Sequence, residues 1–267
     1  MLFLGVNMDL QNKVVVITGA SMGIGAATAR EFVQAGCKVV LAARSEKELN
    51  ALAQELGTER ALAVPTDVSV REQVDALMRQ TVERFGRIDI LVNNAGVGLA
   101  GRVAETDTAK FEHIFAINVL GALYGIQAVV PQMRQQGGGI IMNVSSMVSK
   151  LTIPMIGGYR ATKMALNAIT DNARFELARD NIRVILVYPG ETQTKFFDNT
   201  LDGGGRAAVS GRARRMDPPE HVARKIVEGT RKEPREVFMS SGNRVFALIG
   251  LLMPAMFERM MMGRTSR

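Results

Sequence analysis

The 267-residue sequence predicts a single-domain α/β fold, in which a doubly wound parallel sheet of seven strands carries helices on both faces. Seven short runs are almost continuously apolar and rich in β-branched residues. This pattern indicates strands that are buried on both faces, since a half-exposed strand would alternate apolar and polar residues. Segments with helical periodicity separate the runs, as expected for βαβ units with right-handed crossovers. No internal repeat or linker divides the chain.

The expected elements follow one another in a regular alternation along the chain. The predicted strands are 13–18, 38–43, 61–66, 88–93, 139–145, 183–188 and 236–240. The predicted helices are 26–34, 46–56, 70–85, 108–135, 158–179 and 219–231. We therefore divide the chain into an N-terminal extension (1–9), one dinucleotide-binding and catalytic domain (10–242) and an apolar, Met-rich tail (243–267).

The composition excludes several classes of protein. A hydrophobic content of 47% with 22% charged residues excludes general disorder. Cys37 is the only cysteine, which excludes an intrachain disulfide framework and predicts a cytoplasmic protein without a Cys/His metal site. The net charge is +7, but the excess is concentrated in the Gly-rich segment 206–215 and the chain has no Trp. We predict a solvated loop near an anionic ligand there, and no nucleic-acid binding.

The glycine-rich segment 18–25 follows the first predicted strand and opens the first predicted helix, with the spacing G-x-x-x-G-x-G. Gly19 permits a tight turn, Gly23 permits close approach of a ligand to the backbone, and Gly25 permits close packing of helix and strand. The N–H groups of the first helical turn then face a pyrophosphate. The residues predicted to bind the cofactor here are Gly19, Ser21, Met22, Gly23, Ile24 and Gly25.

A tyrosine and a lysine lie four positions apart at the start of the predicted helix 158–179. Tyr159 and Lys163 share one helix face, so the ammonium group can stabilise the phenolate and lower its pKa toward neutrality. Ser146, after the fifth strand, can orient a substrate oxygen. Alone, Tyr-x-x-x-Lys is a common surface pair, and Asn118 within 108–135 could simply be a buried amide that caps backbone groups. The combination with the glycine segment favours a catalytic site.

In this order, these residues resemble the short-chain dehydrogenase/reductase family, in its Rossmann-like single-domain type of about 250 residues. The resemblance implies that Tyr159 is the acid/base and that Lys163 lowers its pKa and binds the nicotinamide ribose. It also implies that Ser146 binds the substrate oxygen and that Asn118 holds the water of a proton relay. Further cofactor contacts implied by the resemblance are Asp67, Val68, Asn94, Ala95, Gly96, Pro189, Gly190, Thr192 and Thr194.

The end of the second strand indicates which nicotinamide cofactor is used. An NAD site usually has a carboxylate at this position, but here Ala43 is followed by Arg44 and Ser45. A guanidinium can bind a 2′-phosphate, so we predict that NADPH is preferred over NADH. Two observations weigh against this preference. Arg44 could be an ordinary surface arginine, and Met22 stands where the family often has a second basic residue.

The expected function is therefore that of an NADP(H)-dependent oxidoreductase, such as a carbonyl reductase, acting on a hydrophobic carbonyl or alcohol. The segments 98–103, 148–156 and 196–216 are predicted to line its pocket. The alternative is a catalytically silent dinucleotide-binding scaffold or regulator. A homodimer is expected, with a tetramer possible. The polar run 191–194 departs from the family pattern. The tail 243–267 is expected to form a helix packed on the domain or a partner, with a flexible lid over the pocket or a membrane contact as alternatives.

Overall fold

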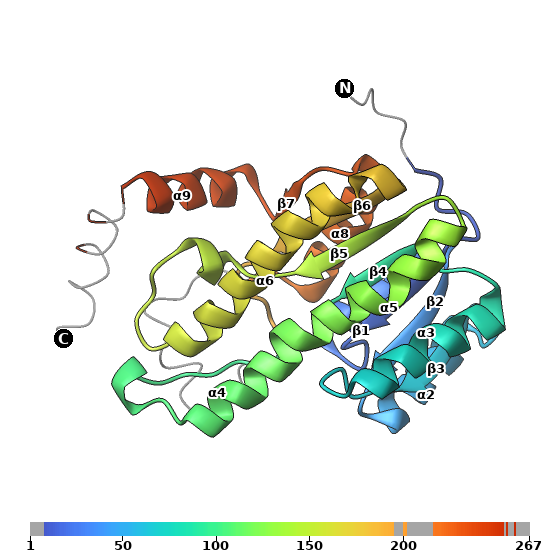
Figure 1. The fold of residues 1–267 in the computed structure, drawn as a ribbon, viewed down its shortest axis with the longest axis horizontal. Helices are drawn as coiled ribbons and strands as arrows, with labels where there is room; N and C mark the ends of the chain where they lie inside the picture. Colours follow the sequence, from blue (N-terminus) through green and yellow to red (C-terminus); the bar gives the residue numbers. More distant parts are fainter. Residues whose placement is uncertain (1–7, 195–199, 202–215, 254, 256–258, 260–267) are drawn as a thin grey trace.

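The computed structural model describes residues 8–194, 200–201, 216–253, 255 and 259 (Figure 1). The described residues form one seven-stranded parallel sheet with the order β3-β2-β1-β4-β5-β6-β7. The chain order reverses between β1 and β4, which creates a crevice at the carboxyl ends of these two strands. The predicted doubly wound α/β fold is confirmed. The strands are β1 (Val14–Thr18), β2 (Lys38–Ala43), β3 (Ala61–Pro65), β4 (Ile90–Asn93), β5 (Gly139–Val144), β6 (Ile182–Tyr188) and β7 (Glu236–Phe238).

The central strands are buried along their whole length, which explains their continuous apolar runs. β1 is buried at all five positions, and Val15 pairs with Val39 of β2 and with Ile90 of β4. Helices on both faces exclude water from these strands, so most of their positions are apolar, and buried polar side chains such as Asn93 of β4 and Asn143 of β5 are hydrogen-bonded to each other. The register brings the ends of β1, β4 and β5 to one edge of the sheet.

Two layers of helices cover the sheet. Buried side chains of α1, α2 and α8 form one core cluster with one face, and those of α3, α5 and α6 form a second cluster with the other. Figure 1 shows α3, α5 and α6 across the near face. The helix bounds are α1 (Gly23–Gln34), α2 (Glu46–Leu56), α3 (Arg71–Phe85), α4 (Thr108–Phe115), α5 (Gly121–Gln135), α6 (Gly157–Glu176), α8 (Pro219–Lys232) and α9 (Ser241–Leu252).

The segment Thr108–Gln135 differs from the single α-helix that its periodicity predicts. A π-helical turn, η2 (Ala116–Leu120), separates α4 from α5, and Asn118 lies in this turn. By length and composition alone the segment could cross a membrane, but 56% of its most apolar window is buried inside the protein. We assign it to the core.

Some boundaries differ from the sequence prediction. α1 begins at Gly23, three residues earlier than expected, and α6 ends at Glu176 instead of continuing to 179. The tail contains the helix α9, which packs on the domain as one of the interpretations of the tail expected. The predicted basic segment 206–215, residues 1–7 of the extension, and most of the tail after residue 253 lie outside the described residues.

Candidate active site

The glycine segment forms a close-packed turn between β1 and α1. Gly19 and Gly23 have φ angles of +67° and +56°, which side chains rarely adopt. A Cβ on Gly25 would lie 2.1 Å from the Gly19 carbonyl oxygen, and one on Gly23 would lie 2.9 Å from Thr194 Cγ2. The first turn of α1 carries no acidic residue that would repel a phosphate. The backbone here therefore fits a dinucleotide, since a side chain on Gly25 would push the turn apart and one on Gly19 or Gly23 would require a strained backbone.

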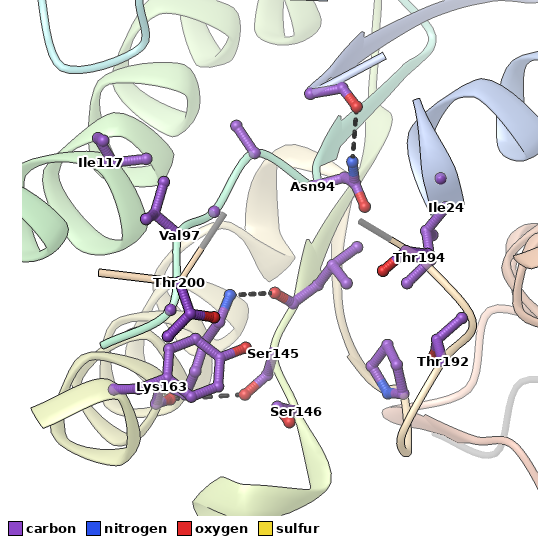
Figure 2. A pocket seen from close by; sticks show the side chains of 18 of the residues that line it. Ile24, Asn94, Val97, Ile117, Ser145, Ser146, Lys163, Thr192, Thr194 and Thr200 are labelled. Carbon is purple, nitrogen blue, oxygen red and sulfur yellow. Dashed lines mark hydrogen bonds between the residues drawn. The ribbon is translucent and has the colours of Figure 1, made fainter. Parts of the chain in front are cut away.

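The loop after β4 is fixed to the glycine turn by four hydrogen bonds. Thr18 Oγ1 accepts from the backbone N–H groups of Asn94 (3.0 Å) and Ala95 (3.1 Å). In return, Asn94 Nδ2 donates to the carbonyl oxygens of Thr18 (3.0 Å) and Gly19 (3.2 Å). The Asn94 side chain thus holds the two loops that flank the crevice at a fixed separation (Figure 2).

Asn118 anchors the loop that follows β4 to the start of α6. Its Oδ1 accepts from the backbone N–H of Val97 (2.8 Å), while its Nδ2 donates to the Val97 carbonyl (2.9 Å) and to Thr162 Oγ1 (3.0 Å). The side chain is buried and does not line the main cavity. These contacts match the alternative interpretation of a buried amide that caps backbone groups. Its implied part in a proton relay stays a prediction.

The first turns of α6 bring Tyr159 and Lys163 to the carboxyl end of β5. Lys163 Nζ donates to the Val144 carbonyl oxygen (2.9 Å) and lies 5.8 Å from the centroid of the Tyr159 ring. Burial, which leaves Lys163 only 3% exposed, lowers the pKa of its ammonium group to about 8. The Lys163 side chain is therefore at least half protonated at pH values up to about 8.

The pKa of Tyr159 differs in direction from the sequence expectation. Burial is the largest influence and raises the pKa of the phenol above its usual value of 10, and a hydrogen bond with Ser146 opposes this effect. The expected lowering by Lys163 is therefore not the dominant influence on the Tyr159 pKa. Tyr159 is therefore a neutral proton donor at neutral pH.

A hydrogen-bond network that the sequence analysis missed holds the backbone around Ser146. Asn167 Oδ1 accepts from Ser145 Oγ (2.6 Å), and Asn167 Nδ2 donates to Ser149 Oγ (3.0 Å). Ser149 Oγ in turn donates to the Ser146 carbonyl oxygen (2.7 Å). Asn167 lies one helical turn after Lys163, and this i+4 spacing is the signal that could have identified it. The network joins α6 to both sides of Ser146.

Arg44 and Asp67, two of the predicted cofactor-binding residues, also line the cavity. Asp67 Oδ1 accepts from the N–H (2.9 Å) and hydroxyl (2.6 Å) of Ser69. Burial raises the pKa of Asp67, but these hydrogen bonds and the nearby charges of Arg44 and His113 outweigh it, and the net pKa is lowered. His113, on α4, also lines the cavity and was not predicted. Arg44 is exposed at the mouth.

One wall of the substrate end comes from the chain's tail. Asn243 and Phe246 of α9 line the cavity, and Asn243 lies beside the loop that follows β6. A Cβ on Gly190 would lie 3.7 Å from Asp217 Oδ2 and 3.8 Å from Asn243 Nδ2. The polar run that departs from the family pattern is paired with Asp217, whose N–H donates to the Glu191 carbonyl (2.9 Å). The sequence analysis placed no tail residue in the site.

The predicted site residues meet in one cavity of about 720 Å³ (Figure 2). Two predicted residues do not line it: Gly25 lies beneath the glycine turn and Asn118 lies behind the loop. The predicted residues that line it are Gly19, Ser21, Met22, Gly23, Ile24, Arg44, Ser45, Asp67, Val68, Asn94, Ala95, Gly96, Ser146, Tyr159, Lys163, Pro189, Gly190, Thr192 and Thr194. A cavity of this size accommodates a small organic ligand.

Comparison with known proteins identifies the family. The model of the short chain dehydrogenases matches residues 13–203, which include the glycine turn and the Tyr159/Lys163 pair. The chain belongs to the short-chain dehydrogenase family. The resemblance noted in the sequence is confirmed, and this short-chain dehydrogenase is an oxidoreductase that uses a nicotinamide dinucleotide and a small-molecule substrate.

Its relatives span bacteria, archaea and an insect. An uncharacterized oxidoreductase of Staphylococcus haemolyticus is 35% identical, over 82% of this chain and 91% of its own. A dehydrogenase/reductase SDR family protein 7-like of Anopheles gambiae is also 35% identical, over 86% and 76% of the two chains.

Two solved structures show the same fold with bound cofactors. A Burkholderia phymatum short-chain dehydrogenase/reductase in complex with NAD has a TM-score of 0.83 at 27% identity, and 91% of this chain and 94% of that chain are covered. A Thermococcus sibiricus alcohol dehydrogenase complexed with 5-hydroxy-NADP has a TM-score of 0.75 at 31% identity, with 85% and 96% covered. One neighbour holds NAD and the other an NADP derivative, so the fold is compatible with either cofactor.

Proposed function

We propose that this short-chain dehydrogenase interconverts a carbonyl and an alcohol on a hydrophobic small molecule, with NADP(H) as cofactor and Tyr159 as acid/base. The observation that carries the proposal is the convergence of Ser146, Tyr159 and Lys163 on the cavity that the glycine turn closes at its other end. When bound, the nicotinamide supplies or accepts the hydride. The protein has to orient the reacting carbonyl and move one proton.

Tyr159 and Ser146 carry the proton and the orientation. Because burial keeps the Tyr159 phenol neutral, it can donate its proton to the carbonyl oxygen of a substrate during reduction. The Ser146 hydroxyl, already hydrogen-bonded with Tyr159, lies at the same place and can donate to the same oxygen. In oxidation the proton returns to the tyrosine, and here Lys163, when charged, stabilises the phenolate.

The lining of the substrate end indicates an apolar substrate. Apolar side chains from four separate segments line this cavity. The apolar side chains are Leu99, Met147, Val148, Leu151, Ile153, Ile156, Leu201 and Phe246. A turnover assay that follows nicotinamide absorbance across a panel of carbonyls tests the proposal. Oxidation or reduction of an apolar member supports it, while cofactor binding without turnover on any member favours the silent scaffold.

NADP(H) is the proposed cofactor because Arg44 directly follows Ala43 at the end of β2, where an NAD site usually has a carboxylate. We expect Arg44→Ala to weaken NADPH binding by about ten- to a hundredfold, since a charge-assisted contact contributes roughly 1.5–3 kcal/mol. NADH, which has no 2′-phosphate, should bind almost as before. Fluorescence titration of both cofactors measures the effect, with Arg79→Ala on the exposed side of α3 as the control. An equal loss for both cofactors, or an initial preference for NADH, would contradict the assignment.

Asn167 is expected to position Ser146. Asn167→Leu removes both side-chain hydrogen bonds that Asn167 makes in the network. We expect kcat to fall by about tenfold, which corresponds to about 1.4 kcal/mol of activation free energy. The Kd of NADPH should stay unchanged because Asn167 does not line the cavity. Asn172→Leu, an exposed change on the same helix, is the control. A loss of cofactor affinity equal to the loss of kcat would show that the residue only stabilises the fold.

We further propose a cytoplasmic homodimer. Phe175 on α6 is 82% exposed and Met164 is 45% exposed, so the outer side of this helix offers an apolar surface to a second copy. Pairing through this surface would hold the helix that carries Tyr159 and Lys163. Mass measurement in solution distinguishes a dimer from a monomer or tetramer.

A further inference from the structure

The two sides of α9 have different environments. On the inner side, Ala247 is buried and Phe246 packs against the cluster that contains Leu151. Gly250 approaches the same segment, since a Cβ there would lie 2.9 Å from Leu151 Cδ2 and 3.2 Å from the Lys150 carbonyl oxygen. At its start, Ser240 Oγ accepts from the Asn243 N–H (3.1 Å). The helix is therefore anchored on the segment that follows Ser146.

The outer side of α9 is apolar and exposed. Val245, Leu248 and Leu252 follow helical spacing and are 55%, 49% and 75% exposed. Leu251 and Met253 extend this surface and are 71% and 50% exposed. Figure 1 shows α9 extending outward from the end of β7, away from the sheet. Four large apolar side chains on α9, together with Met253 directly after it, thus form an exposed apolar strip.

In the sequence, four arginines and one glutamate, Glu258, flank this strip. The sequence has no Asp or Glu between Glu236 and Glu258. Arg244 is exposed in the first turn of α9, Arg259 is exposed seven residues after the end of α9 in the sequence, and the sequence continues with Arg264 and Arg267. An apolar strip flanked by arginines is complementary to a bilayer surface that carries anionic lipid, where the side chains enter the interface and the cations meet the head groups.

The same helix also forms a wall of the active-site cavity. Asn243 and Phe246 of α9 line the cavity. Each is followed directly in the sequence by a residue named above: Arg244 after Asn243, and Ala247 after Phe246. Any surface that receives the outer side of α9 is thus separated from the apolar substrate end by the thickness of one helix.

We propose that the outer side of α9 docks on an anionic lipid bilayer, so that the cavity opens next to the membrane surface. A membrane-dissolved apolar substrate would then enter past Phe246, a step that rests on the function proposed above. The docking itself requires only the apolar strip and the arginines.

Co-sedimentation of the full-length protein with vesicles tests the docking. The probes are vesicles of phosphatidylcholine with one third phosphatidylglycerol, and vesicles of phosphatidylcholine alone. We expect binding to the anionic vesicles that weakens in high salt and falls by about tenfold or more in Leu248→Ser/Leu252→Ser. Val103→Ser, which removes another exposed apolar side chain far from α9 in sequence, is the control and should bind as the wild type does.

Three results would overturn the docking. In the first, the wild type does not bind the anionic vesicles. In the second, the Leu248/Leu252 variant binds them as tightly as the wild type does. In the third, the variant still binds vesicles but no longer self-associates. The last result would assign the strip to a second copy of the chain. Turnover of a water-soluble carbonyl should be the same in wild type and variant, which shows that the variant is folded. A failure of vesicle binding leaves the proposed reaction intact, whereas a failure of turnover leaves the docking intact.

Discussion

Replacing Tyr159 with phenylalanine is expected to lower kcat by about 10²–10⁴-fold, the usual contribution of general acid–base catalysis. The substitution removes only the hydroxyl that donates the proton and leaves the ring packed beside Lys163. The Kd of NADPH should therefore change little. Steady-state kinetics on an established substrate, together with fluorescence titration of the cofactor, measure the two quantities separately.

The chain provides a matched control in Tyr124, which lies on α5 with its ring near the Arg71 guanidinium. Tyr124→Phe removes a hydroxyl outside the cavity and should retain wild-type kcat. Wild-type turnover in Tyr159→Phe would refute the proposed mechanism. Loss of activity in both variants would instead point to a general sensitivity of the fold to tyrosine replacement.

Lys163→Met is expected to reduce activity strongly and to stabilise the protein at the same time. Its ammonium group is buried and is not part of any ion pair seen among the described residues. The lowering of its pKa from 10.5 to about 8 corresponds to roughly 3 kcal/mol of desolvation cost. The lost hydrogen bond to the Val144 carbonyl contributes only about 1 kcal/mol. A net gain of about 2 kcal/mol should raise Tm by about 4–8 °C at pH 7.

The stabilisation should depend on pH in a defined direction. Between pH 8 and 10.5 the unfolded chain still binds the lysine proton while the folded chain has released it, so the stability of the wild type rises with pH in this window. The difference in Tm between Lys163→Met and wild type should therefore be largest below pH 8 and shrink toward pH 10.5. Lys47→Met, on the exposed side of α2, should show no such dependence. A lower Tm of Lys163→Met at pH 7 would contradict the prediction.

The fold could be predicted because its strongest signal is local. Strands such as β1 are buried on both faces, and their continuous apolar runs follow directly from that burial. The π turn around Asn118 could not be predicted in this way. One extra residue in the π turn rotates all later residues around the helix axis. The composition of the segment remains typical of a helix, so its sequence still predicts one uninterrupted helix.

The site was predicted where its residues follow strand ends or helical spacing, as Ser146 and the Tyr159/Lys163 pair do. Residues that reach it through tertiary packing were missed. Asn243 and Phe246 belong to a tail whose composition fits a lid, an interface or a membrane contact equally well, and only its packing on the segment after Ser146 places them in the cavity. His113 was missed because its position on the cavity side of α4 depends on how that helix crosses the sheet edge.

The π turn makes the length of the segment Thr108–Gln135 as important as its composition. Its additional residue rotates α5 by about 100° relative to a continuous α-helix, which lets Asn118 face Val97 while Val129 and Met133 face the sheet. Deleting one residue between Ala116 and Leu120 would produce a regular helix in which these two orientations are incompatible. Natural variants should therefore differ here by substitution and not by insertion or deletion, and a chimaera has to exchange all 28 residues as one unit.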